Sequence, residues 1–513
     1  MPLTKLDIKK ILSDKIIELK PSQIPHFSKL KNIEIATERV VKAIKNREKI
    51  CLVSDYDVDG VVSATIVYQF FKQIDYPIDI IIPNRFNDGY GLTPKILDRV
   101  DATLLITADN GISSYEAATL CKNRGIDLII TDHHTPTYPL PEAYTIIDPK
   151  QKGETFPFVD ICGAEVVWYL MASLNSALNS GIDMRNFLDY LVLAIIADVM
   201  PLNHINRILV KMGLSKLSKS NKPFAQILRS FFRQNYFSSE DIAFNIAPRL
   251  NSAGRMDDAI IAFNFLNADE VVKSRFYFDK LQEKNELRKE IERDITDFCI
   301  KSYKNEKCIV VVGDFHEGVI GIVASRLVHK YKVPAIVFSE KGDILKGSGR
   351  SLGDVHLYQL IEKCKNFTLG FGGHKLACGL TIHKNDFTLF KEMINREVEK
   401  IAPENFFFEE FILGEIELKE CDFELVDIIE EFEPYGEANP RPKFKAKVKI
   451  DTIRNLKDNH YKLILSQNGV YKEGIIFRYN DSFPEEAEII FTIHQNEFNG
   501  NRNIVLRIER IDK

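Results

Sequence analysis

The chain has 513 residues, of which 45% are hydrophobic and 27% are charged, and its net charge is −5. This composition is typical of folded globular proteins, and it excludes a disordered chain and a globally basic one, so any nucleic acid must bind to local positive clusters. The length is sufficient for three or four domains that each have a core.

The N-terminal segment and the cysteines indicate the cellular compartment. Residues 1–15 are charged throughout and contain no apolar core of a secretion signal. No apolar run reaches the ~18 to 20 residues that span a membrane. The eight cysteines form no C-x-x-C pair and no zinc-binding spacing. We therefore expect a cytoplasmic protein with reduced thiols and no membrane partner.

Residues 48–200 alternate short apolar strands with helical stretches, a pattern typical of a parallel sheet with crossover helices. The expected strands are ICLVSD, IDIIIP, TLLITADN, IDLIITDHH and YTIIDP, and the polar residues at their ends are Asp55, Asn84, Asp109, Asp132 and Asp148. The carboxyl ends of such strands meet at one edge of the sheet, where ligands bind. The sequence therefore predicts an acidic site at this edge.

The segment SDYDVDG at residues 54–60 places aspartates at every second position. This spacing resembles the start of an EF-hand calcium loop, which needs a glutamate at position twelve and a helix on each side. Counting from Asp55 places Ile66 at position twelve, and the preceding KICLVSD has the pattern of a strand. The EF-hand is excluded, and the expected order is strand, acidic turn and helix.

Acidic and histidine residues from several segments should meet at the sheet edge: Asp55, Asp57, Asp59, Asp109, Asp132, His133, His134 and Asp198. Hard oxygen ligands with one or two imidazoles suit Mg²⁺ or Mn²⁺ better than zinc. A lone aspartate after a strand is often only a helix cap, and this alternative stays open for Asp132 and Asp148. Capping does not explain the whole set, so we predict two divalent ions ~3.5 to 4 Å apart that act on a phosphoester.

The rest of the chain is expected to form further domains. Residues 186–255 are mainly helical and end in a loop, APRLNSAGRM, and residues 268–304 form a long charged helix that connects two domains. A second α/β pattern starts at Cys308 and includes the glycine-rich segments KGSGRS and GFGGHKLACG. After about residue 405, five or so strands suggest an antiparallel barrel of the OB type. The expected fold class is multidomain α/β, with domains at 1–215, 216–304, 305–400 and 401–513.

Four segments resemble the motifs of the DHH phosphoesterase superfamily: SDYDVDG, TADNG, TDHH and AIIADVMPL. APRLNSAGRM, KGSGRS and FGGHKLACGL then follow in the order found in its bacterial exonucleases, and the resemblance covers about residues 45–510. It implies an exonuclease specific for single-stranded DNA, which hydrolyses phosphodiester bonds from 5′ to 3′ by a two-metal mechanism in DNA recombination and repair.

The resemblance also implies residue roles. The metal ligands would be Asp55, Asp57, Asp59, Asp109, His133 and Asp198, with Asp109 bridging two Mn²⁺ or Mg²⁺ ions. The catalytic residues would be Asp109, His133, His134 and His374, with His134 either a metal ligand or a contact to the scissile phosphate. Asp132 would orient the two histidines beside it. How the ligands divide between the two ions stays open.

Phosphate-binding residues are expected in four segments: Arg85, Asn251, Arg255, Ser348, Arg350 and His374. Ser348 and Arg350, with Arg85, would form a pocket for the DNA 5′-phosphate; an interdomain salt bridge is the alternative for Arg85. His374 would donate to a phosphate oxygen or cap a helix. Arg255 and Asn251, with Arg249, would line the substrate path or brace the domains.

The C-terminal region alternates basic and aromatic residues: Phe444, Lys445, Lys447, Lys449, Arg454, Tyr461 and Lys462. Such a strand face could follow a phosphate backbone while bases stack on it. A solvated edge strand protected by lysines is the alternative.

Two rival functions stay open. The first is a DHH phosphodiesterase that acts on oligoribonucleotides or small nucleotides, and the OB-like region argues against it. The second is a non-catalytic scaffold that binds single strands, and the complete set of acidic residues argues against it. The expected partner is single-stranded DNA. A single-strand-binding protein and a helicase are candidate partners, and a monomer would be sufficient.

Overall fold

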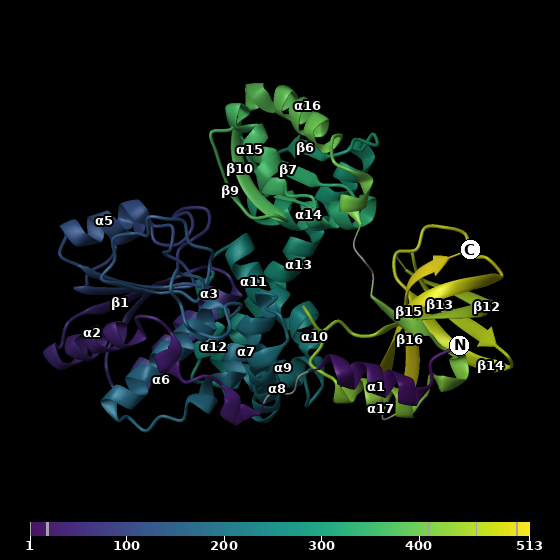
Figure 1. Ribbon diagram of the computed structural model, residues 1–513, viewed down its shortest axis with the longest axis horizontal. Helices are drawn as coiled ribbons and strands as arrows, with labels where there is room; N and C mark the ends of the chain where they lie inside the picture. The colour runs from purple at the N-terminus through teal and green to yellow at the C-terminus, as the bar shows by residue number, and fades with distance from the viewer. Residues whose placement is uncertain (1, 17–19, 408–410, 458, 499–500, 513) are drawn as a thin grey trace.

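The computed structural model describes residues 2–16, 20–407, 411–457, 459–498 and 501–512. Figure 1 shows a first α/β lobe with its helices, a smaller α/β lobe above it, and a C-terminal barrel to one side. The predicted multidomain α/β class is therefore confirmed. None of the helices in the described parts of the chain is long and apolar enough to cross a membrane.

The first lobe contains the expected parallel sheet. Its strands are β1 (Ile50–Ser54), β2 (Asp79–Ile81), β3 (Leu104–Ala108), β4 (Asp127–Thr131) and β5 (Thr145–Ile147), in the order β2-β1-β3-β4-β5. Every neighbouring pair is parallel. All five predicted strands are confirmed, so the polar residues that follow them share one edge.

Helices cover both faces of this sheet because successive strand side chains point in opposite directions. Leu52 and Ile106 face the core that contains α2 (Ile33–Asn46), α3 (Val58–Gln73) and α6 (Gly163–Leu178). Val53 and Leu105 belong to the opposite face, and Leu105 packs in a cluster with α4 (Pro94–Leu97) and α5 (Tyr115–Asn123).

Further helices extend the first core: α7 (Leu188–Ala197), α8 (His204–Lys219), α9 (Pro223–Phe232), α10 (Ser239–Asp241), α11 (Ala247–Met256) and α12 (Ile260–Asn267). A π-helical turn at Ile242–Ile246 precedes α11. The segment APRLNSAGRM was predicted as a loop, and this prediction is wrong because it forms α11. Its proline lies in the first turn, where a missing N–H breaks no helical hydrogen bond.

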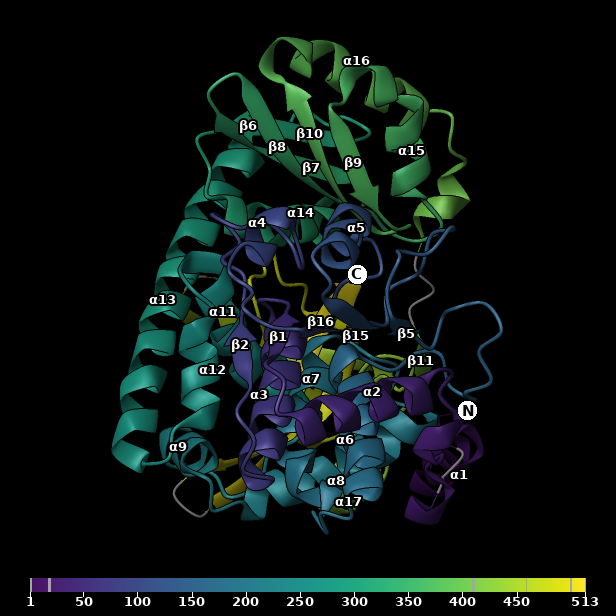
Figure 2. The same ribbon diagram turned by 90° about the vertical axis from the view of Figure 1, so that its left-hand side faces the viewer.

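The long helix α13 (Val271–Ser302) connects the first two lobes, as predicted. Figure 2 shows it running along one side of the molecule from the first lobe to the second. Phe278 and Leu281 pack in the first core, whereas Ile295 and Cys299 pack in the second lobe. One continuous helix therefore joins both cores and holds the second lobe next to the first.

The second lobe contains a mixed sheet with helices on both faces. Its strands are β6 (Ile309–Gly313), β7 (Ala335–Lys341), β8 (Ile344–Arg350), β9 (Gly370–Gly373) and β10 (Ala377–His383), in the order β6-β7-β8-β10-β9. The helices are α14 (Glu317–Tyr331) on one face, and α15 (Leu357–Lys363) and α16 (Phe387–Val398) on the other. KGSGRS starts inside β8, and His374 lies in the turn between β9 and β10.

The C-terminal lobe is a closed barrel. Its strands are β11 (Ile412–Glu415), β12 (Lys443–Lys457), β13 (His460–Gln467), β14 (Val470–Ile476), β15 (Glu486–Phe498) and β16 (Asn501–Asp512), and β15 pairs back to β12. The predicted barrel is confirmed, but β14 and β16 are parallel, so the purely antiparallel arrangement is wrong. A long connection between β14 and β15 allows this crossing.

The N-terminal helix α1 (Lys5–Lys15) packs in the C-terminal lobe beside α17 (Phe423–Glu431), as Figure 1 shows. Ile8 and Leu12 lie in the barrel core, and the Leu3 N–H donates to the Glu415 carbonyl at 2.7 Å. The sequence grouped this segment with residues 1–215, but its apolar side chains are buried among those of the C-terminal lobe.

Candidate metal centre and phosphate-binding cleft

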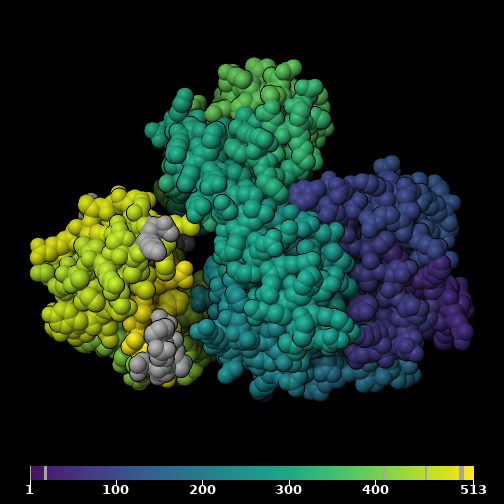
Figure 3. Space-filling view, turned by 180° about the vertical axis from the view of Figure 1, so that it is seen from behind, coloured from purple at the N-terminus to yellow at the C-terminus, as the bar shows by residue number. Residues whose placement is uncertain are grey.

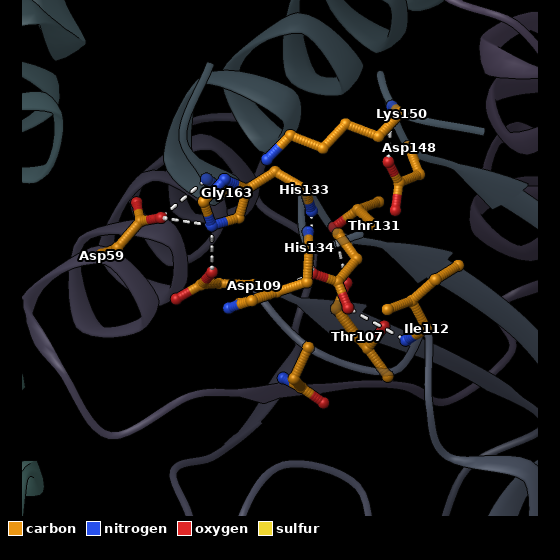
Figure 4. A network of polar contacts seen from close by, with 12 residues as sticks. Asp59, Thr107, Asp109, Ile112, Thr131, His133, His134, Asp148, Lys150 and Gly163 are labelled. Atoms are coloured by element: carbon orange, nitrogen blue, oxygen red, sulfur yellow. Dashed lines mark hydrogen bonds and ion pairs between the residues drawn. The ribbon is translucent and has the colours of Figure 1, made fainter. Parts of the chain in front are cut away.

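The predicted carboxylates meet at the carboxyl edge of the first sheet. Asp55 and Asp109 directly follow β1 and β3, Asp57 caps α3, and Asp59 lies in the first turn of that helix. Asp198 follows the last residue of the buried helix α7. Figure 4 shows the side chains of Asp59 and Asp109 turned toward the same imidazole ring. The shared strand direction therefore brings distant parts of the chain together.

His133 lies at the centre of this group. Its Nε2 is 3.2 Å from Asp109 Oδ1, 3.5 Å from Asp198 Oδ2 and 3.8 Å from Asp59 Oδ2. Burial, with the charge of His134, lowers the pKa of His133 to about 3. The imidazole is therefore neutral at physiological pH, which is the form that binds a metal ion.

The potential ligand atoms form three overlapping groups. In the first group they belong to Asp55, Asp57 and Asp109, in the second to Asp59, His133 and Asp198, and in the third to Asp109, His133 and His134; within each group they lie within 4.8 Å of one another. Asp109 belongs to the first group and contacts His133 of the second. The geometry thus separates Asp55 and Asp57 from Asp59, a division that the sequence left open.

The chemistry of these donors fits divalent cations. Asp109 Oδ1 and Asp198 Oδ2 are buried and have no hydrogen-bond partner among the described residues. Burial and neighbouring carboxylates raise the pKa of Asp109 well above its ordinary value, that of Asp59 to about 6 and that of Asp198 to about 9. Cations would let all these groups ionise together. Oxygen ligands with an imidazole suit Mn²⁺ or Mg²⁺.

Asp132 orients the two histidines. Its Oδ1 accepts from the His133 N–H at 2.7 Å and lies 2.7 Å from His134 Nδ1, and its Oδ2 accepts from the Ile112 N–H at 2.9 Å. Burial alone would lower the pKa of His134, but this hydrogen bond and the charge of Asp132 raise it to about 9. A protonated His134 cannot bind a metal ion through its occupied nitrogens, but it can donate to a phosphate.

Removal of divalent ions should make the protein less stable as the pH rises from 7 to 9. Asp198, with its pKa near 9, and Glu165, whose pKa burial raises to about 8, are examples of the groups involved. Both ionise near pH 4 in an unfolded chain, so the stability present at low pH is lost as the pH rises through the folded pKa. Each group lowers the free energy of unfolding by up to ~1.4 kcal/mol per pH unit. His133 acts in the opposite direction, but only below its unfolded pKa of ~6.5.

Thermal unfolding of EDTA-treated protein at pH 7, 8 and 9 measures this effect. Added Mn²⁺ should raise Tm most at pH 9, where protons compete least for the ligands. Asp198→Asn should reduce the slope, because asparagine does not titrate. A metal-free Tm that stays level or rises over this range would contradict the expectation.

Three arginines lie close together where the first two lobes meet: Arg85, Arg255 and Arg350. The Arg85 Nε–H donates to the Gly254 carbonyl at 3.2 Å, and the Arg255 guanidinium donates to the Gly318 carbonyl at 3.4 Å. Burial and the charge of Arg85, with that of Arg350, lower the pKa of Arg255 to about 10. In the described ranges none of the three pairs with a carboxylate, so the interdomain salt bridge considered for Arg85 is not formed there. Uncompensated guanidinium groups fit a phosphate.

Ser348 and Arg350 approach this cluster from β8 of the second lobe. The Arg350 guanidinium donates to Ser348 Oγ at 3.2 Å and to the Gly349 carbonyl at 2.8 Å. His374, in the adjacent hairpin turn, is exposed, and burial of its ring edge with the charges of His134 and Lys150 lowers its pKa. The second lobe therefore presents Ser348, Arg350 and His374 to the cleft.

Two residues of α11 have bracing contacts. Asn251 Oδ1 accepts from the Val58 N–H at 3.2 Å, which supports the acidic turn and leaves only the amide N–H₂ for a substrate. The Arg249 Nε–H donates to Gln282 Oε1 at 2.7 Å, on α13. The bracing role thus describes the contacts of Arg249, and Arg255 also joins the lobes through Gly318 while it lines a groove of the molecule.

A groove of about 580 Å³ lies between the helices around α11 and the C-terminal lobe. Residues along its walls include Val199, Phe244, Arg255, Arg288, Tyr435 and Arg441. Val199 and Phe244 are 62% and 68% exposed, although both are large and apolar. Figure 3 shows a gap between the C-terminal lobe and the rest of the molecule on this side. Ile196, Ala197 and Val199, which flank Asp198 in the sequence, line one end of the groove wall.

The basic strand face predicted in the C-terminal region is not supported by its contacts. Phe444 is fully buried in the barrel, so it cannot stack with a base. Lys445, Lys449 and Lys462 pair with glutamates of neighbouring strands, at 3.5, 2.9 and 2.7 Å. Tyr461 packs against Phe483. Lys447 and Arg454 are exposed. The alternative of an edge strand protected by lysines does not apply either, because β12 pairs with β13 on one side and with β15 on the other.

Other residues near the site were not identified from the sequence. The Arg441 guanidinium lies 4.7 Å from the centroid of Tyr435, and that of Arg507 lies 5.3 Å from the centroid of Phe477. The members of the second pair are distant in sequence, so local patterns could not reveal it.

Tyr90 and Lys150 were also missed. The Tyr90 ring is 6.3 Å from the His134 ring, and burial and nearby carboxylates raise the pKa of its hydroxyl. Lys150 lies just after β5, and Figure 4 shows its side chain extending over the two histidines. Two sequence features could have identified these residues: Tyr90 lies in a glycine-rich loop, and Lys150 follows a predicted strand.

Comparisons with known proteins agree with this geometry. Residues 49–195 match the DHH family N-terminal domain, residues 305–400 the DHHA1 domain and residues 412–510 the RecJ OB domain. The single-stranded-DNA-specific exonuclease RecJ of Haemophilus influenzae is 32% identical, covering 94% of this chain and 91% of that protein. The RecJ exonuclease of Escherichia coli is 31% identical with the same coverage.

Solved structures show the same fold. The crystal structure of RecJ in complex with Mn²⁺ from Thermus thermophilus matches with a TM-score of 0.82 and 25% identity, covering 99% of this chain and 74% of that chain. The Mg²⁺ complex of RecJ from the same organism matches with a TM-score of 0.76 and 24% identity, covering 94% of this chain and 70% of that chain.

Proposed function

Because the chain belongs to the RecJ family of single-stranded-DNA-specific exonucleases, we propose that it hydrolyses single-stranded DNA from the 5′ end and releases mononucleotides. It is a metal-dependent exonuclease of the DHH type. The observation that carries the proposal is the buried cluster of carboxylates around His133, which faces a group of unpaired arginines across the cleft.

The ligands divide between two ions of Mn²⁺ or Mg²⁺. Asp55 and Asp57 would hold one ion, and Asp59, His133 and Asp198 would hold the other. Asp109, which lies in the first group and touches the second, would hold both. When bound, the ions would activate water for attack on phosphorus and stabilise the negative charge that develops.

The remaining polar groups would bind the DNA strand. His134, held by Asp132 in its protonated form, would donate to the scissile phosphate, and His374 would approach it from the second lobe. Arg85, Ser348 and Arg350 would hold the 5′-terminal phosphate by charge-assisted hydrogen bonds. Anchoring that end next to the metal centre would make cleavage proceed from 5′ to 3′.

The strand would reach the site along the groove beside the C-terminal lobe. Arg507 lies over the exposed ring of Phe477 and so places a guanidinium group next to an aromatic ring. Such a pair can neutralise phosphates and stack with bases whatever the sequence. Arg441 lies over the buried ring of Tyr435 and already pairs with Glu240 and Glu433, at 3.0 Å each. Because the protein carries a net negative charge, binding should depend on these local groups and weaken steeply with salt.

Three labelled substrates test the proposed function. A long 5′-labelled single strand, the matching duplex and a dinucleotide are incubated with the protein and Mn²⁺, and products are separated by size. We expect labelled mononucleotide from the long single strand and at least about a hundredfold slower hydrolysis of the duplex. Preference for the dinucleotide would favour a phosphodiesterase of small nucleotides, and binding without hydrolysis of any of them would favour a scaffold.

The cellular setting is part of the proposal. Family membership supports a role in DNA recombination and repair in the cytoplasm. In that role a single-strand-binding protein and a helicase would supply the single strand, and one copy of the chain contains every residue of the proposed site.

A further inference from the structure

The first turn of α6 (Gly163–Leu178) lies directly against the metal centre. The Gly163 N–H donates to Asp59 Oδ2 at 2.6 Å, and the Ala164 N–H donates to Asp59 Oδ1 at 2.9 Å. Figure 4 shows Gly163 beside Asp59. N–H groups at the start of a helix have no carbonyl partner inside it, and the positive end of the helix dipole favours an anion there. One helix end therefore holds both oxygens of this carboxylate.

The cap of this helix is supplied from another part of the chain. The residue before the helix is Cys162, whose thiol is a weak acceptor compared with the serine, threonine, aspartate or asparagine preferred there. Asp59, 104 residues away, accepts the two free N–H groups instead. The Cys162 N–H donates to Glu165 Oε2 at 2.8 Å, which holds the turn closed. The turn is thus built around a carboxylate of the metal centre.

The same turn also touches Asp109. A Cβ atom at Gly163 would lie 2.5 Å from the Cβ of Asp109 and 2.8 Å from its Oδ1. Real Cβ atoms do not approach so closely, so any side chain at this position would displace Asp109 or the helix. The backbone of Gly163 is in an ordinary helical conformation, so the glycine is needed for space. One turn therefore positions two carboxylates, that of Asp59 in the first turn of α3 and that of Asp109 after β3.

From these contacts we infer that the turn Cys162–Glu165 is the positioning element of the metal centre: it fixes the orientation of Asp59 and, through the missing side chain of Gly163, the location of Asp109. The inference rests on the proposed role of Asp59 and Asp109 as metal ligands. Groups that orient metal ligands commonly change metal affinity 10- to 100-fold when they are removed. The turn should therefore matter for metal binding even though it contributes no ligand.

Ala164→Pro is the most selective test. Proline has no N–H, so this change deletes the hydrogen bond to Asp59 Oδ1, and proline is tolerated in the first turn of a helix. We expect the dissociation constant for Mn²⁺ to rise about 10- to 100-fold. Isothermal titration of the full-length, EDTA-treated protein with Mn²⁺ measures this constant, and electron paramagnetic resonance reports whether a coupled pair of ions still forms.

Gly163→Ala tests the contact with Asp109, and Gly213→Ala is its matched control. A Cβ at Gly213 would lie 2.6 Å from the Cβ of Val192, so it creates a similar overlap between two helices inside the same core. Gly213→Ala should lower Tm and leave the Mn²⁺ affinity within about twofold. Gly163→Ala should weaken Mn²⁺ binding at least tenfold. If Gly163→Ala does not fold, the Mn²⁺ affinity of Ala164→Pro decides whether the turn positions the metal ligands.

The possible results separate this inference from the proposed function. Normal Mn²⁺ binding by Ala164→Pro overturns the inference, whether or not its Tm falls. If Asp109→Ala loses Mn²⁺ binding in the same experiment, the proposed metal centre still stands. If Asp109→Ala also binds Mn²⁺ normally, the proposed function fails together with the inference. Weakened binding by Ala164→Pro, with normal binding by Gly213→Ala, supports the inference.

Discussion

Asp109→Ala should abolish hydrolysis of single-stranded DNA, with a fall in kcat/KM of about 10³-fold or more. The effect is large because Asp109 belongs to the first group of ligands and lies 3.2 Å from His133 of the second. Loss of this carboxylate should weaken binding of both ions. Single-turnover hydrolysis of a 5′-labelled strand with saturating Mn²⁺ measures the chemical effect, and calorimetric titration measures the binding.

The variant should fold, because in the metal-free protein Asp109 is a buried carboxylate whose Oδ1 has no hydrogen-bond partner in the described parts of the chain. Removal of the buried carboxylate favours folding, but Asp109 has a φ of 61°, which alanine tolerates less well than aspartate, so the Tm of the metal-free protein should change little. Asp148→Asn is the matched control, because Asp148 is also buried at a strand end on the same sheet edge but lies outside the ligand groups. Normal turnover by Asp109→Ala would disprove the two-ion assignment.

Arg350→Ala should reduce kcat/KM about 30- to 200-fold on a strand with a 5′-phosphate, and much less on one with a 5′-hydroxyl. Hydrogen bonds to a charged group are worth ~1.5 to 3 kcal/mol each, and a guanidinium can make two to one phosphate. Arg350 is largely shielded from water and contacts only Ser348 and a backbone carbonyl among the described residues. Its charge is therefore available for a phosphate.

A comparison of the two 5′ ends distinguishes this role from a structural one. Arg350→Lys should recover part of the rate, since lysine keeps the charge but loses the planar fork. Arg396→Ala removes the same charge from the outer helix α16 of the same lobe, where the side chain is exposed, and should leave the rate unchanged. Equal losses on both 5′ ends would show that Arg350 does not read the terminal phosphate.

The parallel sheet of the first lobe could be predicted because its strands are short, apolar and separated by helical segments. The strands other than the edge strand β2 are largely buried on both faces, and the residue after each strand marks the carboxyl edge. The convergence of Asp55, Asp109 and His133 follows from strand direction alone. Local signals of this kind do not depend on contacts with distant residues.

The helical form of APRLNSAGRM and the burial of Phe444 could not be predicted in the same way. Proline and glycine in the first segment favour a loop locally, but packing of α11 on α13 and α14 outweighs that preference. The alternation around Phe444 identifies a strand with two faces but does not state which face is inside. The pairing of β15 with β12 closes the barrel and decides which face is inside. The same pairing places Lys445 beside Glu488.

The sequence by itself determined the acidic edge, the likeness to DHH phosphoesterases and the residue types that bind divalent ions. Those conclusions depend on periodicity, spacing and donor chemistry, which are local properties of the chain. Only the tertiary structure decided which carboxylates lie close together, that three arginines meet where the first two lobes join, and that the first turn of α6 holds Asp59. These are contacts between segments far apart in the chain, and their distances are set by how helices and sheets pack.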